Sequence, residues 1–326
     1  MNDPGVSAAS SRVLLATDLS RPAKRAARFL ARLPFPKPPV VRLVQTVELP
    51  VGPLTFHFDD EWPALFVGAR DAARAALKEE AEAFAGLTEQ VSVSVRHGLP
   101  AEETLAEAGR FGADLIVTGA VGHGAVERAL LGSVSDRVAT HAACPVLIVR
   151  GTNAPGATID EADRTGGDAG PPDRPPRVIV GCDGSPASRS AARAIAEFDW
   201  PPQTRVTLLS FVLPVAPDWA AADWPGVLPT GDYEAMIRAE RERAGISVEL
   251  ASLPFRDRGL DVRTEVAETD HVGDALCDRA ELEDADLLVV ADKGHNAFTR
   301  FLVGSVTRFV LRHSARPVWL HRGGRG

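Results

Sequence analysis

The chain is poor in several features that mark particular classes of protein. Its 326 residues include three cysteines, and no two of them have the CxxC spacing of a metal or redox site. Cys144, Cys182 and Cys277 are therefore expected to be buried, reduced thiols rather than disulfides or metal ligands. The formal net charge of -8 argues against nucleic acid as a partner, because surfaces that bind nucleic acid are normally basic.

Long apolar runs are also missing. No segment is long enough and apolar enough to cross a bilayer, and residues 1–10 lack the charged start and apolar core of a secretory signal. The sequence therefore predicts a cytoplasmic protein with no membrane partner. Hydrophobic residues make up 45% and charged residues 25% of the chain, as in ordinary globular domains.

What the chain does contain is an internal repeat. Residues 113–119 (ADLIVTG) match residues 285–291 (ADLLVVA), and residues 12–20 (RVLLATDLS) match residues 177–185 (RVIVGCDGS). A repeat of this kind fixes the architecture before any single residue is interpreted.

The repeat predicts two complete domains of ordinary size, at residues 10–150 and 177–322. Between them, residues 151–176 are rich in glycine, proline and polar residues and contain little that could be buried. We expect this segment to be a flexible linker.

Each copy alternates apolar strand patterns with helix patterns. The predicted strands are 13–17, 40–47, 91–96, 115–118 and 146–149, and in the second copy 178–182, 206–212, 261–266, 287–290 and 318–321. The predicted helices are 22–33, 64–85, 101–110, 187–198, 232–252 and 272–282. Ser20 and Ser185 are expected to cap the first helix of each copy. The alternation predicts an α/β protein of two tandem doubly wound, Rossmann-like domains with five-stranded, mostly parallel sheets.

A glycine-rich loop follows the fourth strand of the first copy, with the spacing Gly119-x2-Gly122-x9-Gly132-Ser133. Glycine lets backbone N–H groups approach a phosphate closely, and a helix that opens at Gly132-Ser133 offers free N–H groups to an anion. The loop has neither the Gly-Lys-Ser/Thr of a Walker loop nor the full dinucleotide fingerprint.

The pattern resembles the universal stress protein family, whose ATP-binding members carry G-x2-G-x9-G-(S/T) at this place. Further motifs support the resemblance: the Asp-x-Ser turn after the first strand, Gly-Leu-Pro at residues 98–100, and the closing Pro-Val-Leu-Ile-Val strand at 145–149. The resemblance covers nearly the whole chain in two copies. It implies an adenine nucleotide alpha-hydrolase-like fold and ATP as the cofactor, bound with or without Mg²⁺.

The resemblance also implies which residues hold the nucleotide. Asp18 and Asp183 would contact the adenine or ribose side, and the loop glycines and helix starts would hold ribose and phosphates. The full set in the first copy is Asp18, Thr46, Gly119, Gly122, Gly132, Ser133, Val134 and Ser135. In the second copy it is Asp183, Phe211, Gly294, Gly304, Ser305, Val306 and Thr307.

The second copy departs from the family pattern at two points. Ala291 replaces the first glycine of the loop, and residues 268–270 (Glu-Thr-Asp) stand where the first copy has residues 98–100. The alanine methyl could weaken binding or merely shift the loop. The sequence therefore favours the first domain if only one domain binds nucleotide.

Plainer interpretations stay open beside these. The glycine loop could exist only to make a tight turn, and Asp18 and Asp183 could be turn residues at the start of a helix. His123 and His295 follow loop glycines but have no evident nucleophile beside them, so we expect solvent-facing side chains and no catalytic residue.

Three functions compete at this stage. The first is an ATP-binding universal stress protein that regulates a stress response and hydrolyses ATP slowly at most. The second is a nucleotide-free dimerisation or scaffold module for a protein client. The third, an enzyme of the wider nucleotide-binding α/β group, lacks its signature motifs. The family resemblance further implies that strands 146–149 and 318–321 pair the two domains within one chain, and leaves a homodimer open.

Overall fold

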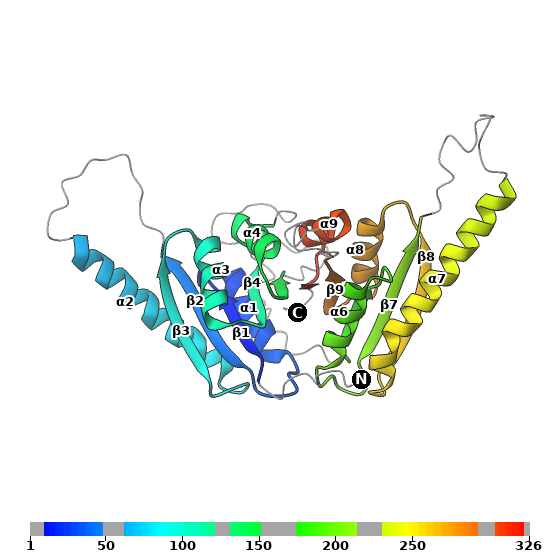
Figure 1. Ribbon diagram of the computed structural model, residues 1–326. Coiled ribbons are helices and arrows are strands. Elements are labelled where there is room, and N and C mark those ends of the chain that lie inside the picture. The colour runs from blue at the N-terminus through cyan, green and yellow to red at the C-terminus, as the bar shows by residue number, and fades with distance from the viewer. Residues whose placement is uncertain are drawn as a thin grey trace, which may run out of the picture. The chain divides into compact units, whose positions relative to one another are not determined.

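The computed structural model describes residues 10–47, 62–120, 131–150, 174–213, 230–292 and 304–322. The chain divides into two compact units, Met1–Arg150 and Gly151–Gly326, here called the first and the second domain. In each, helices flank a sheet (Figure 1).

The first domain alternates strands and helices from its start. Its elements are β1 (Arg12–Ala16), α1 (Arg21–Arg32), β2 (Val40–Val47), α2 (Trp62–Ala81), the 3₁₀ helix η1 (Glu82–Phe84), β3 (Val91–His97), α3 (Pro100–Phe111), β4 (Leu115–Gly119), α4 (Ser133–His141) and β5 (Val146–Val149).

The second domain repeats this order. Its elements are β6 (Arg177–Gly181), α6 (Pro186–Ala196), β7 (Arg205–Val212), α7 (Thr230–Arg256), β8 (Asp261–Glu268), α8 (Val272–Leu282), β9 (Leu287–Ala291), α9 (Ser305–His313) and β10 (Val318–His321).

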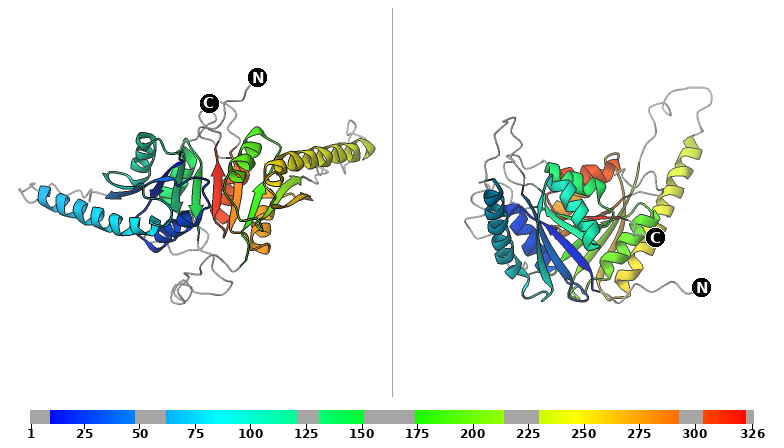
Figure 2. Two further views of the ribbon diagram at one scale, coloured as in Figure 1. Left: turned by 90° about the horizontal axis from the view of Figure 1, so that it is seen from below. Right: turned by 60° about the vertical axis from the view of Figure 1, so that its left-hand side comes forward.

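The strands of each domain are parallel and follow one order. It is β3-β2-β1-β4-β5 in the first domain and β8-β7-β6-β9-β10 in the second. The order turns back between β1 and β4, and between β6 and β9, as it does at the switch point of a doubly wound sheet. Helices α1 and α2 cover one face of the first sheet and α3 and α4 the other, and α6–α7 and α8–α9 do the same in the second (Figure 2). The predicted fold class is confirmed.

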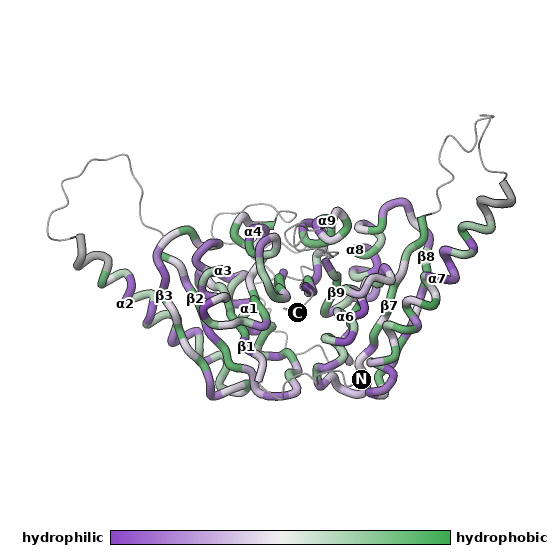
Figure 3. Tube along the Cα trace, viewed as in Figure 1, coloured by the Kyte–Doolittle hydropathy of each residue, from purple (hydrophilic) through white to green (hydrophobic). Residues whose placement is uncertain are grey.

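The central strands form the core of each domain. Val13, Leu14 and Leu15 of β1 have no exposed surface, and Ile179 and Val180 of β6 have none either. Full burial of such a side chain contributes about 2 kcal/mol. Hydrophobic residues accordingly follow the strands in both domains (Figure 3). The continuous apolar runs are therefore strands that are buried on both faces, as predicted.

A repeated aspartate ties the fourth strand to the start of the first. Asp114 Oδ2 accepts a hydrogen bond from the backbone N–H of Arg12 at 2.8 Å. In the second domain, Asp286 Oδ2 accepts one from Arg177 N–H, also at 2.8 Å. The aspartate of the repeated Ala-Asp-Leu motif thus has a structural role in both domains.

Two predicted helices differ from the observed ones by more than two residues at one end. The helix predicted at 64–85 is α2 followed by the 3₁₀ turn η1. The helix predicted to end at residue 252 continues through Pro254 to Arg256. Phe255 has no exposed surface, so its burial anchors the last turn of α7 although a proline there lacks a hydrogen-bond donor.

All three cysteines are free thiols. Cys182 and Cys277 are buried as expected, but Cys144 is only half-buried. Cys182 follows β6 rather than lying in it. Burial, with a smaller contribution from the negative charge of Asp183, raises the pKa of the Cys182 thiol to about 12. A thiol with so high a pKa is protonated and unreactive at neutral pH.

Candidate functional site

The candidate site lies at the carboxyl ends of β1 and β4 in the first domain, and of β6 and β9 in the second. Each switch point brings together the turn that carries Asp18 or Asp183 and the strand end that carries Gly119 or Ala291. In doubly wound sheets ligands bind at this place.

The aspartate turn is built in the same way in both domains. Asp18 Oδ1 accepts from Ser20 N–H, and Asp183 Oδ1 accepts from Ser185 N–H, each at 3.0 Å. Each aspartate therefore uses one carboxylate oxygen to shape its own turn, which supports the turn-residue interpretation for that oxygen.

The serine of each turn caps the following helix. Ser20 Oγ accepts from Ala23 N–H at 3.4 Å, and Ser185 Oγ accepts from Ser188 N–H at 3.1 Å. The predicted capping serines are confirmed. Because these hydroxyls satisfy first-turn N–H groups, α1 and α6 offer less to an anion than an uncapped helix would.

Helices α4 and α9 begin differently. Their N-caps are Gly132 and Gly304, which provide no side-chain hydrogen bond. The first N–H groups of a helix have no partner within the helix, and the helix dipole adds partial positive charge there. Residues 133–135 and 305–307, the first helical residues, thus present backbone donors that suit a phosphate.

Two of the predicted ligand-binding hydroxyls donate hydrogen bonds to backbone carbonyls of the protein. Ser135 Oγ donates to Gly119 O at 2.7 Å, and Thr307 Oγ1 donates to Ala291 O at 3.1 Å. Gly132 N–H also donates to Ala120 O, at 2.7 Å. These bonds fix the start of α4 or α9 against the strand end, so the buried hydroxyls of Ser135 and Thr307 position the site.

Gly119 is required by a neighbouring helix. A Cβ on Gly119 would lie 2.9 Å from the carbonyl carbon of Pro22, closer than real Cβ atoms come to other atoms, and 3.1 Å from Ala23 N. The missing side chain therefore admits the first turn of α1. Ala291 stands at this position in the second domain, at the end of a strand that packs against α6.

Thr46 lies near the carboxyl end of β2 in the first domain, and Phe211 lies near the carboxyl end of β7 in the second. Thr17 N–H donates to Val44 O at 3.0 Å, which places Thr46 two residues beyond the point where β2 meets the Asp18 turn. Both Thr46 and Phe211 are half-buried. Gly122 and Gly294, with His123 and His295, lie outside the described residues.

The helix starts correct one alignment between the copies. Helix α3 has Leu99 as its N-cap and α8 has His271. Residues 98–100 therefore correspond to residues 270–272, not to 268–270. The left-handed Gly98, with a φ of 136°, is thus matched by Asp270. The sequence comparison missed this because the second copy has two extra residues here, one in β8 and one between β8 and the N-cap of α8.

One pair of site residues escaped the sequence interpretation. Asp292 follows β9 where Ala120 follows β4, and Arg322 Nη1 lies 3.5 Å from Asp292 Oδ2. Both side chains are buried, at 4% exposure for Asp292 and 6% for Arg322. The signal that could have revealed them is a charged residue directly after each of two apolar strands.

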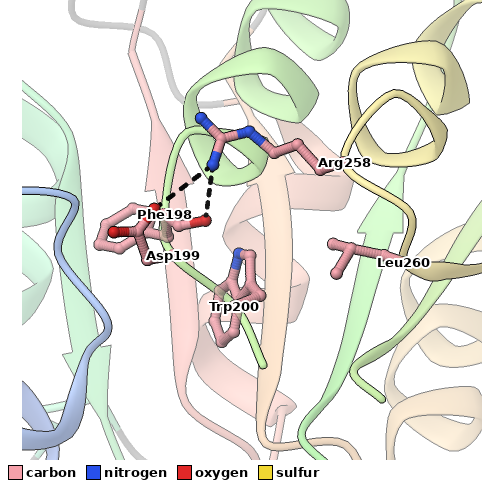
Figure 4. A pocket seen from close by; sticks show the side chains of 5 residues that line it. All are labelled: Phe198, Asp199, Trp200, Arg258 and Leu260. Carbon is pink, nitrogen blue, oxygen red and sulfur yellow. Dashed lines mark hydrogen bonds and ion pairs between the residues drawn. The ribbon is translucent and has the colours of Figure 1, made fainter. Parts of the chain in front are cut away.

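A separate pocket of about 240 Å³ lies in the second domain, lined by Phe198, Asp199, Trp200, Arg258 and Leu260 (Figure 4). Arg258 Nη1 donates to Phe198 O at 3.3 Å and lies 3.6 Å from Asp199 Oδ1. These residues precede β7 and β8, at the opposite end of the strands from the aspartate turn. The pocket is therefore distinct from the candidate site.

Among the described residues, no group of three or more His, Cys, Asp or Glu side chains could hold a metal ion. A search of the same residues for helices long and apolar enough to cross a membrane finds none.

Comparison with known proteins gives one consistent result. The model of the universal stress protein family matches residues 10–150 and 176–322. A universal stress protein of Mycolicibacterium smegmatis is 30% identical over 78% of this chain and 76% of its own length. One of Mycobacterium tuberculosis is 30% identical over 64% of this chain, and the chain spans 62% of that relative's length.

Among solved structures, a universal stress protein from Archaeoglobus fulgidus is similar, with a TM-score of 0.57 and 17% identity over 96% of both chains. At this identity the likeness bears on the fold. It extends over both domains, since nearly the whole chain is covered.

Proposed function

The chain belongs to the universal stress protein family, and on that premise we propose that its first domain binds ATP and that the protein acts as a regulator in a stress response. The proposed contacts are Asp18, Thr46, Gly119, Gly122, Gly132, Ser133, Val134 and Ser135. The proposal places the protein in the cytoplasm.

The observation that carries the proposal is the start of α4. Gly132 leaves the first-turn N–H groups without a side-chain cap, and the Ser133 side chain is exposed beside them. This donor set suits a phosphate, and the Asp18 turn beside it offers a carboxylate to ribose or adenine groups. Bound Mg²⁺ would neutralise phosphate charge.

We propose a binding protein rather than an efficient enzyme. Within the described part of the site, Asp18 is tied into its turn and Ser133 has no histidine beside it that could act as a general base. Backbone donors and a bound metal alone would support slow hydrolysis at most.

The first experiment identifies the ligand. Freshly purified full-length protein is denatured, the released small molecules are identified by mass spectrometry, and the amount is counted per chain. We expect about one ATP per chain. Absence of nucleotide, together with no binding of added ATP and Mg²⁺, would contradict the proposal.

A pair of matched variants locates the site. Ser133→Asp adds a negative charge at the start of α4, which suits the helix dipole but repels a phosphate. Ser305→Asp makes the same change at the start of α9. We expect Ser133→Asp to lose nucleotide and Ser305→Asp to keep it, with both proteins folded by circular dichroism. Retention of nucleotide by Ser133→Asp would exclude the start of α4.

A scaffold function is the second candidate, and it applies to the second domain. The buried Asp292 places a carboxylate at the strand end where a phosphate is expected. A nucleotide-free second domain could instead bind a protein client. Pairing of strands 146–149 and 318–321, and assembly into a homodimer, stay predictions.

A further inference from the structure

The strand that leads into the candidate site is followed by a carboxylate, Asp292, in the second domain and by Ala120 in the first. Asp292 N–H donates to His321 O at 3.0 Å, and Ala120 N–H donates to Val149 O at 3.0 Å. This backbone hydrogen bond is therefore common to the two domains, whereas the side chain of the residue that makes it differs.

Asp292 is held by a cation inside the second domain. Its Oδ2 lies 3.5 Å from Arg322 Nη1, and neither side chain is more than 6% exposed. A buried carboxylate stays ionised only where a partner of opposite charge offsets its loss of hydration. The ion pair with Arg322 thus keeps a negative charge fixed at the end of β9.

This fixed charge lies close to the start of α9. Thr307 Oγ1 in the first turn of α9 donates to Ala291 O at 3.1 Å, and Asp292 is the next residue. The first-turn N–H groups of α9 would otherwise present the same donors as those of α4. A phosphate that approached them would find the neighbouring cation, Arg322, already paired with the Asp292 carboxylate.

Arg322 is neutralised by the same contact. A buried arginine at the edge of a phosphate site would normally attract the anion. In the second domain the Asp292 carboxylate already pairs with this arginine. The carboxylate therefore takes the place that a phosphate would otherwise occupy beside this cation.

We infer that Asp292 closes the second domain to nucleotide phosphates, with the Asp292–Arg322 pair standing in for a bound anion. The inference rests on the proposed function, because it names the residue that makes the two sites unequal. It predicts that removal of one carboxylate opens the second domain.

The test counts nucleotide per chain in full-length protein with added ATP and Mg²⁺, by isothermal titration calorimetry. We expect one site in the wild type and two in Asp292→Ala. Asp292→Asn keeps the shape of the side chain without its charge, and we expect it to gain the second site as well. The apparent Kd of the second site should fall by at least about tenfold.

Two further variants serve as controls. Asp278→Ala removes an equal charge from the exposed side of α8 and should leave the count at one. Ala120→Asp introduces the carboxylate into the first domain and should remove its nucleotide. In the double variant Ala120→Asp, Asp292→Ala, the single bound nucleotide should move to the second domain, where Ser305→Asp then abolishes it.

The outcomes separate this inference from the proposed function. One nucleotide in wild type and still one in Asp292→Ala overturns the inference and leaves the first-domain site standing. None in wild type but one in Asp292→Ala supports the inference and removes the first-domain assignment. Two in wild type, or none in either protein, overturns the inference. Should Asp292→Ala fail to fold, the isosteric Asp292→Asn decides by the same counts.

Discussion

The two domains share one strand order but place their unusual backbone conformations on different residue types. In the turn after the first strand, Leu19 has a φ of 62° and Gly184 a φ of 74°. In the turn after α3 or α8, glycine is instead in the first domain: Gly112 has a φ of 67° and Asp284 a φ of 50°. Glycine adopts this region without strain, whereas other residues do not. Both turns therefore require a positive φ. Each domain has glycine at one of the two turns and a residue with a side chain at the other.

The domains also reverse a charge on the helix that follows the third strand. Glu107 of α3 accepts hydrogen bonds from Arg42 and Arg110, each at 3.1 Å. At the corresponding place on α8, Arg279 instead donates to Glu265. A residue of either charge fits this position, because in each domain a partner of opposite charge lies beside it.

The largest effect is expected at Glu107, the more buried of these two charges. The side chain of Glu107 is 5% exposed, against 29% for Arg279. Glu107→Ala leaves several arginines without their shared carboxylate and should lower the free energy of unfolding by about 3 kcal/mol, whereas Arg279→Ala should cost about 1 kcal/mol. Urea denaturation measures both. Equal costs would show that burial does not distinguish the two positions.

The Glu107 contribution depends on pH. Burial alone would raise the pKa of Glu107, but hydrogen bonds from Arg110 and Arg42 outweigh it and lower the pKa. Its contribution is therefore present above the pKa of the unfolded chain and is lost as pH falls through the folded pKa. In Glu107→Gln the free energy of unfolding, measured by urea denaturation, should fall less steeply at acidic pH than in the wild type.

A second difference lies at the end of the last strand, where His321 stands in place of Val149. Burial lowers the pKa of His321 to about 4. Because the folded pKa is depressed, the unfolded chain binds the proton first and the second domain loses stability as pH falls from 6.5 toward 4. The loss between pH 7 and 5 should be about 2 kcal/mol.

His321→Val gives the second domain the residue of the first and should abolish this loss. Thermal unfolding followed by circular dichroism at pH 7 and pH 5 measures it. His141→Ala, at an exposed histidine of the first domain, is the control and should change nothing. An unchanged pH dependence in His321→Val would assign the loss to other groups.

The third difference is Gly119 against Ala291. Gly119→Ala places a methyl group against the backbone of Pro22 and should lower the free energy of unfolding by about 1.5 kcal/mol. Ala291→Gly should cost less than 1 kcal/mol, about the entropic penalty of glycine. If Gly119→Ala is as mild as Ala291→Gly, the first turn of α1 is free to move aside.

The smallest effect is expected at the aspartate turn. Leu19→Gly removes a left-handed strain of about 1 kcal/mol and adds chain entropy of comparable but smaller size, so a net gain of about 0.5 kcal/mol is expected. Gly184→Leu should destabilise, because a Cβ there would meet Ser247 Oγ at 2.8 Å. Melting temperatures compare the two, and a loss of stability in Leu19→Gly would contradict the strain.

The sequence by itself determined the features that depend on residues close together in the chain. Apolar runs gave β1 and β6, a serine followed by proline gave the starts of α1 and α6, and Gly-Ser gave the starts of α4 and α9. These depend on local periodicity and on hydrogen bonds within one turn. The repeat then fixed the order of the elements in both domains.

Only the tertiary structure decided what each site residue does, because that depends on chain segments far apart in the sequence. Gly119 has no room for a side chain because α1 lies against it, and the Ser135 hydroxyl donates a hydrogen bond to Gly119 O. Asp292 matters because Arg322, at the end of another strand, lies against it. A parallel sheet gathers the ends of distant strands at one edge, so the charges that meet there are set by strand order.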